Sequence, residues 1–395
     1  MSAPSATAAR TTGSPQAVGA LRVLHVVAQM RPGGIETWLL EVLRRIDRQR
    51  FQLDFLVHTD QPQPYDDEIR ALGGRVIPCL AAQRPWRYAP QFRRALAANG
   101  PYDVIHSHMH LYSGFILRMA AQAGVPVRIA HSHTDTRPIV ASSGWLRRQY
   151  AALMQRWLAR YATIGVGCSG QAVESLFGED WRTDPRWRIY YCGIGMERFA
   201  QPVDQAAVRA ELGIPSGRKV IGHVGRFEPL KNHALIVETA RELRRRRDDV
   251  HFLLVGEGDL RSTIEQQVAA AGLSDRFSFP GARSDVPRIL RGAMDAFMFP
   301  SFREGLGLAL VEAQAAGVPA VFTEAISPEV ELVPSLMHRL PRNTAAANWA
   351  DQLEKLLDRP PRIEPSQTLA AVAGSHFNID QGVRELERMY RDGRP

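Results

Sequence analysis

The chain has 395 residues, 45% hydrophobic and 23% charged, which is the composition of a globular protein long enough for two domains. No apolar run approaches the roughly 20 residues of a membrane-spanning helix, and three scattered cysteines give neither a disulfide framework nor a metal spacing. The formal net charge of +8 suits anionic ligands such as nucleotides, an anionic membrane face or nucleic acid, although arginine-rich chains are often basic without any partner.

The first twenty residues are small and polar and lack the apolar stretch of a signal peptide. They predict a disordered tail, 1–20, on a protein that stays inside the cell.

A first series of strand-length apolar runs follows the tail, with helix-like stretches such as 34–47 between most of them. The runs are LRVLHVVA from Leu21, FQLDFLVH from Phe51, RVIPCL from Arg75, DVIHSH from Asp103, RIAHSH from Arg128 and TIGVGC from Thr163. Continuous apolar strands that alternate with helices predict a parallel sheet covered on both faces.

The pattern breaks at 192–218, where no strand is expected, and then a second series begins. Its runs are KVIGHVG (219–225), HFLLVGEG (251–258), RFSFPG (276–281), DAFMFP (295–300) and VPAVFT (318–323). We therefore predict an α/β protein of two tandem Rossmann-like, doubly wound domains, 21–195 and 196–375, which face each other across a cleft. A last helix within 376–395 could pack on either domain, including back on the first.

The stretch FREGLGLALVEAQAAGVPA (302–320) sets Glu304 and Glu312 eight residues apart in an apolar, glycine-rich passage. A helix is predicted to begin near Gly307, and its free amides and positive dipole end would bind an anion. Gly305 and Gly307 would let the ligand approach the backbone. A diphosphate held there would leave one carboxylate for hydroxyls on each side, as in a sugar nucleotide. The alternative is a pair of solvated surface glutamates.

A second cluster, GHVGRFEPLKNH (222–233), lies between the first strand of the second domain and a helix. It places Arg226 and Lys231 on one loop, where a planar guanidinium and an ammonium suit a diphosphate without a metal. Two ordinary surface cations are the alternative.

Histidines crowd two strand ends of the first domain: His106, His108, His110, His131 and His133. Ligands bind at strand ends, so His108 and His133 are predicted to contact a sugar or an acceptor. His106 and His131 are interpreted as core residues. A metal site is disfavoured because no set of carboxylates or cysteines completes one.

The segment WLRRQYAALMQRWLARYA (145–162) mixes aromatic, aliphatic and arginine residues at helical spacing. It either packs its apolar stripe inward or lies on an anionic membrane, where it would collect a lipid-linked acceptor.

Together, R-x4-K at 226–231 and E-G-x-G-x4-E at 304–312 resemble the retaining glycosyltransferase family 4, whose fold is called GT-B. The resemblance covers 21–391. The motifs GGIET (33–37), DVIHSHMH (103–110) and AHSHT (130–134) look most like the subgroup that builds bacterial exopolysaccharides and capsules.

The resemblance implies that Arg226 and Lys231 neutralise the donor diphosphate and that Glu304 holds hydroxyls of the donor sugar. Glu312 would bind the ribose. The backbone of the loop between the glutamates would meet the phosphate or the sugar, and it comprises Gly305, Leu306, Gly307 and Leu308.

The remaining donor contacts come from other loops. Arg283 and Val286 lie where the family contacts the base, and Gly33 and Gly34 would approach the phosphates from across the cleft. His133 would lie near the anomeric carbon, so the implied catalytic residues are His133, Glu304, Arg226 and Lys231. His108 would contact the acceptor.

The chain departs from the family at the domain junction, where many members have Asn-Gly-Ile-Asp and this chain has Cys192-Gly193-Ile194-Gly195. Any role carried by that Asn and Asp is therefore in doubt.

The sequence thus predicts transfer of a hexose from a UDP- or GDP-sugar to a glycan or lipid-linked acceptor, with retention of configuration and with no metal or cofactor. The enzyme is expected in the cytoplasm, with peripheral contact to the inner face of the membrane as one option, and without nucleic acid as a partner. The alternatives are a nucleotide-sugar 2-epimerase of the same fold, a non-catalytic nucleotide-binding protein, or a nucleic-acid-binding protein.

Overall fold

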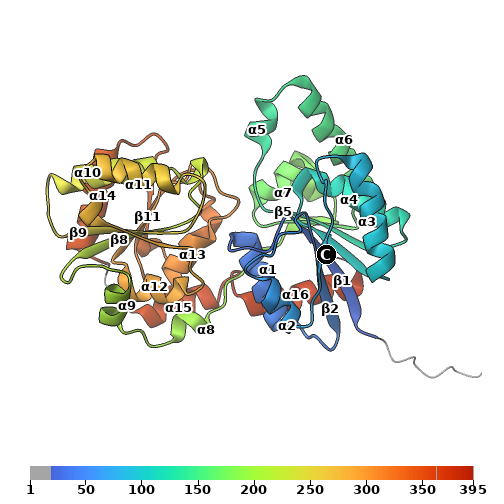
Figure 1. Cartoon of the computed structure of the whole chain (residues 1–395), viewed down its shortest axis with the longest axis horizontal. Helices are drawn as coiled ribbons and strands as arrows, with labels where there is room; N and C mark the ends of the chain where they lie inside the picture. Colours follow the sequence, from blue (N-terminus) through green and yellow to red (C-terminus); the bar gives the residue numbers. More distant parts are fainter. Residues whose placement is uncertain (1–18, 362, 395) are drawn as a thin grey trace, which may run out of the picture.

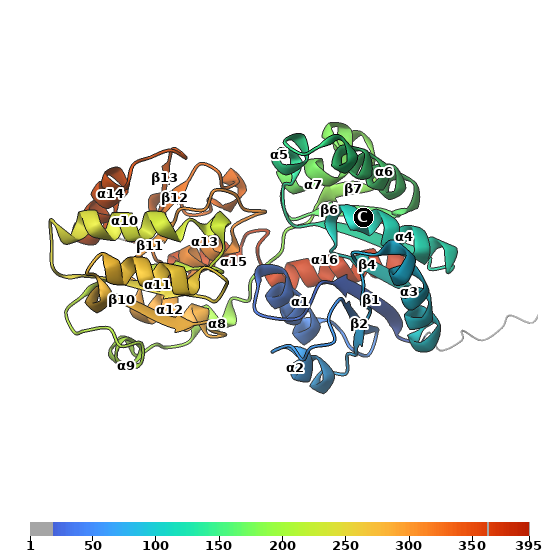
Figure 2. The ribbon, with the colours of Figure 1, turned by 45° about the horizontal axis from the view of Figure 1, so that its top comes forward.

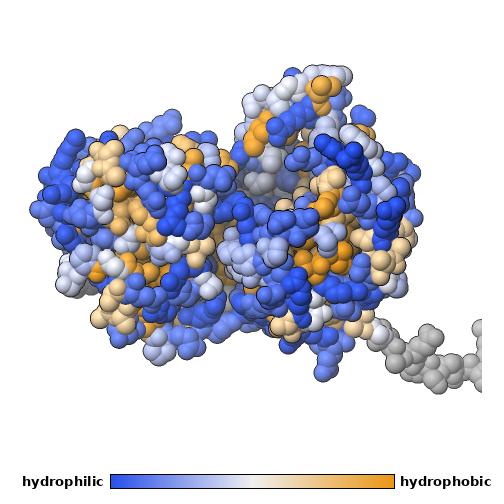
Figure 3. Space-filling view, in the orientation of Figure 1, coloured by the Kyte–Doolittle hydropathy of each residue, from blue (hydrophilic) through white to orange (hydrophobic). Residues whose placement is uncertain are grey.

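The structure is a computed structural model that describes residues 19–361 and 363–394. The predicted disordered tail, 1–20, lies outside these residues except for its last two positions. Two lobes stand side by side, each built around one parallel sheet (Figure 1). The surface is hollowed between them (Figure 3).

The N-terminal domain contains a seven-stranded parallel sheet in the order β3-β2-β1-β4-β5-β6-β7. Its strands are β1 (Leu21–Val27), β2 (Phe51–Val57), β3 (Val76–Pro78), β4 (Val104–Ser107), β5 (Val127–Ser132), β6 (Ile164–Gly167) and β7 (Trp187–Ile189). Alternate residues of β1 enter two separate cores, with Val23 and Val27 on one face and Leu24 and Val26 on the other. The sheet is therefore covered on both faces, as predicted.

Helices of the N-terminal domain connect these strands. They are α1 (Gly34–Arg45), α2 (Asp66–Ala71), α3 (Pro85–Asn99), α4 (Ser113–Gln122), α5 (Arg137–Ala141), α6 (Trp145–Tyr161) and α7 (Gly170–Phe177), with short 3-10 turns η1 (His110–Tyr112) and η2 (Glu179–Thr183). Helices α5 and α6 project from the domain (Figure 1).

The C-terminal domain contains a six-stranded parallel sheet in the order β10-β9-β8-β11-β12-β13. Its strands are β8 (Lys219–Val224), β9 (Val250–Val255), β10 (Phe277–Gly281), β11 (Ala296–Phe299), β12 (Ala320–Thr323) and β13 (Met337–Leu340). Its helices, with those of the segment that precedes it, are α8 (Glu197–Ala200), α9 (Gln205–Glu211), α10 (His233–Arg244), α11 (Arg261–Ala270), α12 (Val286–Ala293), α13 (Leu308–Ala315), α14 (Ala346–Asp358) and α15 (Pro365–Ala373). Further 3-10 turns are η3 (Pro229–Lys231), η4 (Ser274–Arg276), η5 (Pro328–Val330) and η6 (Pro334–Leu336). The predicted pair of tandem Rossmann-like domains is thus confirmed.

The last helix, α16 (Ile379–Asp392), returns to the N-terminal domain and packs against α1 and β1 (Figure 2). The outgoing and returning chains meet where Ile194 forms a parallel bridge with Asn378 and donates its amide to the Phe377 carbonyl oxygen at 2.8 Å. A side chain on Gly193 would strike the backbone of Ile379 at 2.7 Å. The junction therefore needs glycine at this position because two chain segments are in contact there.

Loops at the carboxyl ends of the strands also join the two domains. The Ser169 hydroxyl, after β6, donates to the carbonyl oxygen of Gly305 at 2.8 Å, and the Gly170 amide donates to Glu329 Oε1 at 3.1 Å. The carboxyl ends of the two sheets thus face each other, which is where doubly wound folds bind ligands. Among the helices of the described residues, none is long and apolar enough to span a bilayer.

Candidate functional site

An ion pair between Lys231 and Glu304 lies at the carboxyl ends of the C-terminal sheet. Lys231 Nζ is 2.6 Å from Glu304 Oε1, and only 15% and 13% of the two side chains are exposed. Lys231 ends the turn after β8, and Glu304 lies in the loop after β11, so neighbouring strands bring the two sequence-predicted residues together. The ammonium of Lys231 and the carboxylate of Glu304 are thus in contact and largely shielded from water.

The loop from Glu304 leads into α13, whose N-cap is Gly307. Gly307 has φ of +91°, the left-handed region that favours glycine. A side chain on Gly305 would overlap the carbonyl oxygen of His133 in the other domain. Both glycines therefore have structural reasons for their identity, and the close approach of a ligand to them stays a prediction. Anion binding by the amides at the start of α13, including that of Leu308, stays a prediction.

Arg226 faces the N-terminal domain from the loop after β8. Half of its side chain is exposed, and its guanidinium pairs with Glu228 at 3.2 Å. Burial raises the pKa of Glu36 on α1, whereas the positive charges of Arg226 and Arg31 lower it. A second cation of the C-terminal domain thus lies beside the first helix of the N-terminal domain.

Gly33 and Gly34 form the start of α1, the helix of the N-terminal domain that carries Glu36. Gly33 is the extended N-cap, and the Glu36 carboxylate occupies the space where a side chain of residue 33 would lie. A Cβ on Gly34 would meet no atom within 4 Å. Packing therefore gives no reason for glycine at position 34, whereas a ligand that approaches the backbone would.

Glu312 lies one turn into α13 and is partly buried. Burial raises its pKa to about 7, the charge of Arg198 lowers it, and the charge of Glu41 on α1 raises it. The carboxyl therefore changes its ionisation near neutral pH at the interface between the domains.

Arg283 and Val286 occupy the start of α12. The Arg283 guanidinium donates to Asp285 at 2.8 and 2.9 Å and to Glu211 at 2.6 Å, and these hydrogen bonds raise its pKa above the usual range. Val286 is half-buried against the main core. The guanidinium is thus committed to two carboxylates, and base binding by either residue stays a prediction.

The predicted histidines His108 and His133 belong to a buried cluster on the face of the sheet that α16 covers. His108 is 8% exposed, and its two ring nitrogens lie 3.0 Å from His25 and 2.9 Å from His133. His108 thus has no free ring nitrogen for an acceptor, which argues against its predicted contact. The other ring nitrogen of His133, Nδ1, is 3.8 Å from the sulfur of Cys192.

His106 and His131 complete the cluster and are fully buried, as interpreted. Burial lowers the pKa of every ring, to about 3 for His25 and His133 and well below the usual value for His106, His108 and His131. Ligand nitrogens of His25, His106 and His108 lie within 4.8 Å of one another, as do those of His108, His131 and His133. Each imidazole is therefore neutral, and the absence of a metal stays a prediction.

Sequence reasoning missed three groups of residues near the cleft. Glu36 lies in the motif GGIET, in which only the two glycines were assigned a role. Ser169 and Glu329 carry no motif. His25 and Tyr390 lie 365 residues apart, yet the Tyr390 hydroxyl is 3.2 Å from His25 Nε2. Only a contact prediction between the first strand and the last helix could have found that pair.

The chain matches known families over both domains. The family described as "Glycosyl transferase 4-like domain" matches residues 33–189, and "Glycosyl transferases group 1" matches residues 204–369. The "Putative glycosyltransferase EpsF" of Bacillus subtilis (strain 168) is 34% identical over 375 residues, which cover 93% of this chain and 96% of that protein. The chain belongs to the GT-B glycosyltransferases. The predicted GT-B fold and the predicted resemblance to glycosyltransferases of this fold are thereby confirmed.

Two further matches place this glycosyltransferase among its relatives. The UDP-Gal:alpha-D-GlcNAc-diphosphoundecaprenol alpha-1,3-galactosyltransferase of Escherichia coli is 25% identical over 316 residues, covering 76% of this chain and 79% of that protein. The crystal structure of Anabaena HepE in complex with UDP superposes with a TM-score of 0.75 at 18% identity, covering 94% of this chain and all of that one. HepE was also crystallised with UDP-glucose.

Proposed function

We propose that this glycosyltransferase moves a hexose from a UDP- or GDP-linked donor to a glycan or lipid-linked acceptor, with retention of configuration. We place it in exopolysaccharide or capsule synthesis, in the cytoplasm and at the inner face of the membrane. The relationship to EpsF supports glycosyl transfer as the reaction. The complexes of HepE with UDP and UDP-glucose support a nucleotide-sugar donor.

The ion pair between Lys231 and Glu304 carries the proposal. The ammonium pairs with Glu304, which lies in the loop just before the N-cap of α13, and the charge of Arg226 acts on Glu36 of α1, the helix that begins at Gly34. A diphosphate placed there would meet two cations and the helix amides, while Glu304 accepts hydrogen bonds from sugar hydroxyls and Glu312 from the ribose.

The mechanism follows from where charge develops. As the bond from the anomeric carbon to the diphosphate breaks, negative charge grows on the leaving phosphate, and Arg226, Lys231 and the amides of α13 stabilise it. Such preorganised electrostatics usually gives the largest part of catalysis. Retention would follow from attack on the same face as the leaving group, with the departing phosphate accepting the acceptor's proton.

No metal or cofactor enters this proposal, since two cations and the helix amides suffice to neutralise a diphosphate. Addition of UDP or GDP should therefore raise the melting temperature in the presence of EDTA as much as in magnesium. A nucleotide response that requires magnesium would contradict the proposal.

Donor hydrolysis tests the function. The purified protein, given a panel of UDP-, GDP- and ADP-sugars, should slowly release free sugar from one of them, with the α or β configuration of the donor in the first product seen by NMR. Conversion of UDP-N-acetylglucosamine to its 2-epimer would instead indicate the epimerase, and no response to any nucleotide would refute donor binding.

The proposed membrane contact rests on α6. Trp145 is 66% exposed and Leu146 75%, although Met154 and Leu158 pack inward. Apolar atoms gather at the tip of the projection that α5 and α6 form (Figure 3). Part of the helix therefore packs inward, as one predicted alternative has it, and its exposed part is what the proposed membrane contact would use.

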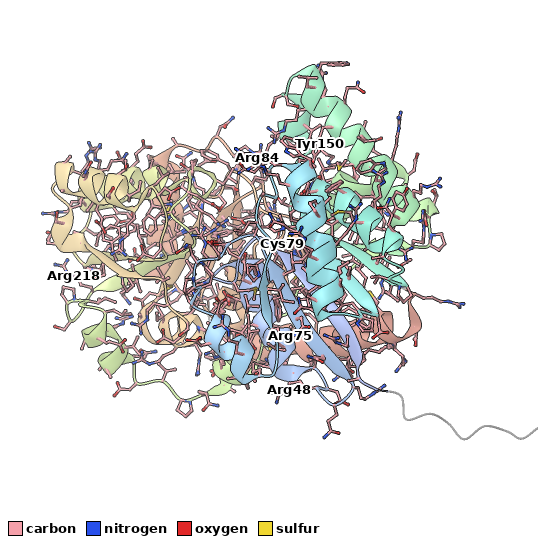
Figure 4. The ribbon with its side chains drawn as sticks, turned by 45° about the vertical axis from the view of Figure 1, so that its right-hand side comes forward. Arg48, Arg75, Cys79, Arg84, Tyr150 and Arg218 are labelled. Atoms are coloured by element: carbon pink, nitrogen blue, oxygen red, sulfur yellow. The ribbon has the colours of Figure 1, made fainter. Side chains whose placement is uncertain are left out.

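Cations accompany the exposed apolar residues. Arg147 and Arg148 follow Leu146 directly and form no ion pair among the described residues. Arg84, ahead of α3, and Tyr150 on α6 lie at the same end of the domain (Figure 4). An amphipathic tip that carries free arginines suits an anionic lipid surface.

Vesicle flotation tests this contact. The protein should float with vesicles of phosphatidylglycerol but not with vesicles of phosphatidylcholine, and Trp145→Ser with Leu146→Ser should abolish flotation while donor hydrolysis persists. The control replaces Arg245, which is 72% exposed at the end of α10 in the other domain, with Ser. Equal flotation of the wild type and the double variant would refute a contact through α6.

A further inference from the structure

Seven groups, all buried except the partly buried His133, form one unbranched series of polar contacts behind the cleft, here called the relay. In order, they are Cys192, His133, His108, His25, Tyr390, His106 and His131. Successive polar atoms lie 2.9 to 3.2 Å apart, except for the sulfur contact at 3.8 Å. Strands β1, β4 and β5 supply the histidines, and α16 supplies the hydroxyl in the middle.

The contacts run head to tail. Nε2 of His133 meets Nδ1 of His108, and Nε2 of His108 meets Nδ1 of His25. Nε2 of His25 then meets the Tyr390 hydroxyl. That hydroxyl meets Nδ1 of His106, whose Nε2 meets Nδ1 of His131.

This order restricts where the protons lie. A neutral imidazole has one N–H and one lone pair, so each ring must donate to one neighbour and accept from the other. If every contact is a hydrogen bond and the Tyr390 hydroxyl donates, all bonds point in one direction. All five histidines then carry their proton on the same atom, either Nε2 throughout or Nδ1 throughout.

The Cys192 end decides between the two directions. Burial raises the pKa of this thiol well above its usual value, so it keeps its proton. His133 Nδ1 is the only hydrogen-bond partner of the sulfur among the described residues, so donation to Nδ1 is the one arrangement in which the thiol proton is bonded. The opposite end is His131 Nε2, which is buried without a partner. The chain of bonds therefore begins at the thiol next to the cleft and ends at an N–H in the core.

We propose that this relay fixes the Nε2–H form of His133, and that Tyr390 is a positioning residue that acts on the cleft through His25 and His108. His133 Nδ1 is thereby kept as an acceptor. Its present partner is a weak donor at 3.8 Å, which a hydroxyl of the donor sugar would replace. The inference rests on the proposed function only in this last step, because the proton positions are a property of the protein alone.

The test uses the full chain with 15N-labelled histidine and long-range 1H–15N NMR spectra. In the wild type, His25, His106, His108, His131 and His133 should each show a single Nε2–H form. Tyr390→Phe removes the central hydroxyl, so the rings on both sides lose a partner and should show mixed proton positions. Tyr190→Phe is the matched control, because its hydroxyl also holds α16, donating to Gly382 at 2.9 Å, but touches no histidine nitrogen.

Kinetics supply the second readout. Tyr390→Phe should lower kcat of donor hydrolysis about tenfold with KM within about twofold, while Tyr190→Phe changes neither more than about twofold. A wild-type spectrum with unlike or mixed forms among the five rings, or a stoichiometric bound metal ion, would overturn the relay even if Tyr390→Phe fails to fold. An inactive wild type with five Nε2–H rings would refute the proposed function and leave the relay standing.

Discussion

Lys231 and Glu304 are partners in the protein without ligand, and this has a consequence for binding. A donor diphosphate must compete with Glu304 for the ammonium. Glu304→Gln removes the competitor, so UDP should bind about fivefold more tightly, a gain of ~1 kcal/mol for a partly screened pair. Turnover of a UDP- or GDP-sugar should fall roughly 100-fold, because the variant loses a contact to the reacting sugar.

Isothermal titration with the nucleotide that binds, together with donor hydrolysis, measures these opposite effects. Glu242→Gln is the control, since Glu242 pairs with Arg245 on the exposed side of α10, 2.7 Å apart. Weaker nucleotide binding by Glu304→Gln would show that the carboxylate does not compete for Lys231.

The raised pKa of Glu312 predicts how stability depends on pH. The folded protein holds this proton up to about pH 7, whereas the unfolded chain loses it near 4.5. The stabilisation is complete below pH 4.5 and is lost as the pH rises through about 7, by on the order of 2 kcal/mol. Glu312→Gln should therefore melt a few degrees above the wild type at pH 8 and at the same temperature at pH 4.

Nucleotide binding should show the opposite trend, because ribose hydroxyls donate to the ionised carboxylate. Wild-type affinity for UDP should rise between pH 6 and pH 8 more than that of Glu312→Gln, a comparison that cancels the ionisation of UDP itself. Parallel pH profiles of the two proteins would refute the ribose contact.

For single residues, the sequence predicted those that lie in motifs of fixed spacing, such as R-x4-K and E-G-x-G-x4-E. Lys231 and Glu304 meet because each follows a strand of one parallel sheet, which the pattern of apolar runs indicates. Arg283 shows the limit of the approach, because its ion pairs with Asp285 and Glu211 depend on the packing of α9 beside α12.

Loops and helix starts explain the glycines in different ways. Gly305→Ala should push the loop before α13 away from His133, because the added Cβ overlaps its carbonyl oxygen. Donor hydrolysis should fall roughly 100-fold, as expected for a displaced site. Gly34→Ala is the comparison, since its Cβ meets nothing within 4 Å and alanine favours the helix by about 1 kcal/mol.

Gly34→Ala should therefore keep or raise the melting temperature and still weaken nucleotide binding, if the phosphates approach α1. Small-angle scattering should show a more open shape for Gly305→Ala only. Unchanged UDP affinity in Gly34→Ala would remove α1 from the donor site.

Strands with apolar runs of strand length were predictable, including the edge strands β3 and β10, whereas the edge strands β7 and β13 were not predicted. Strand β7 has three residues and β13 has four, and each pairs with only one neighbour in its sheet. An edge strand needs no continuous apolar run, because one of its sides is not covered by another strand. The segment 192–218 holds no strand, as predicted, but contains the short helices α8 and α9.

The whole molecule begins and ends on the same domain, and the sequence left open which domain the last helix joins. Helix α16 buries an apolar face there, and Arg188 on β7 forms an ion pair with Glu385 at 2.9 Å. The face comprises Ile379, Val383, Leu386, Met389 and Tyr390, each at most 4% exposed. The helix that covers this part of the N-terminal sheet is therefore synthesised only after the C-terminal domain.

This arrangement predicts the behaviour of an isolated N-terminal domain. The buried face of α16 contributes on the order of 10 kcal/mol, which equals the whole stability of an ordinary domain. Residues 19–195 alone should lack a cooperative melting transition. Fusion to 376–394 through a short glycine–serine linker should restore one, because the two segments already meet at Ile194 and Asn378.

Circular dichroism during heating and urea titration measures the difference between the two fragments. The control fusion carries Leu386→Ser, which leaves the linker and the charge unchanged but removes a fully buried side chain. It should unfold at a lower temperature and urea concentration than the unchanged fusion. If residues 19–195 alone unfold as cooperatively as the fusion, α16 is an attachment to a finished domain. In that case, Tyr390 would act on the cleft only through its contacts in the folded protein.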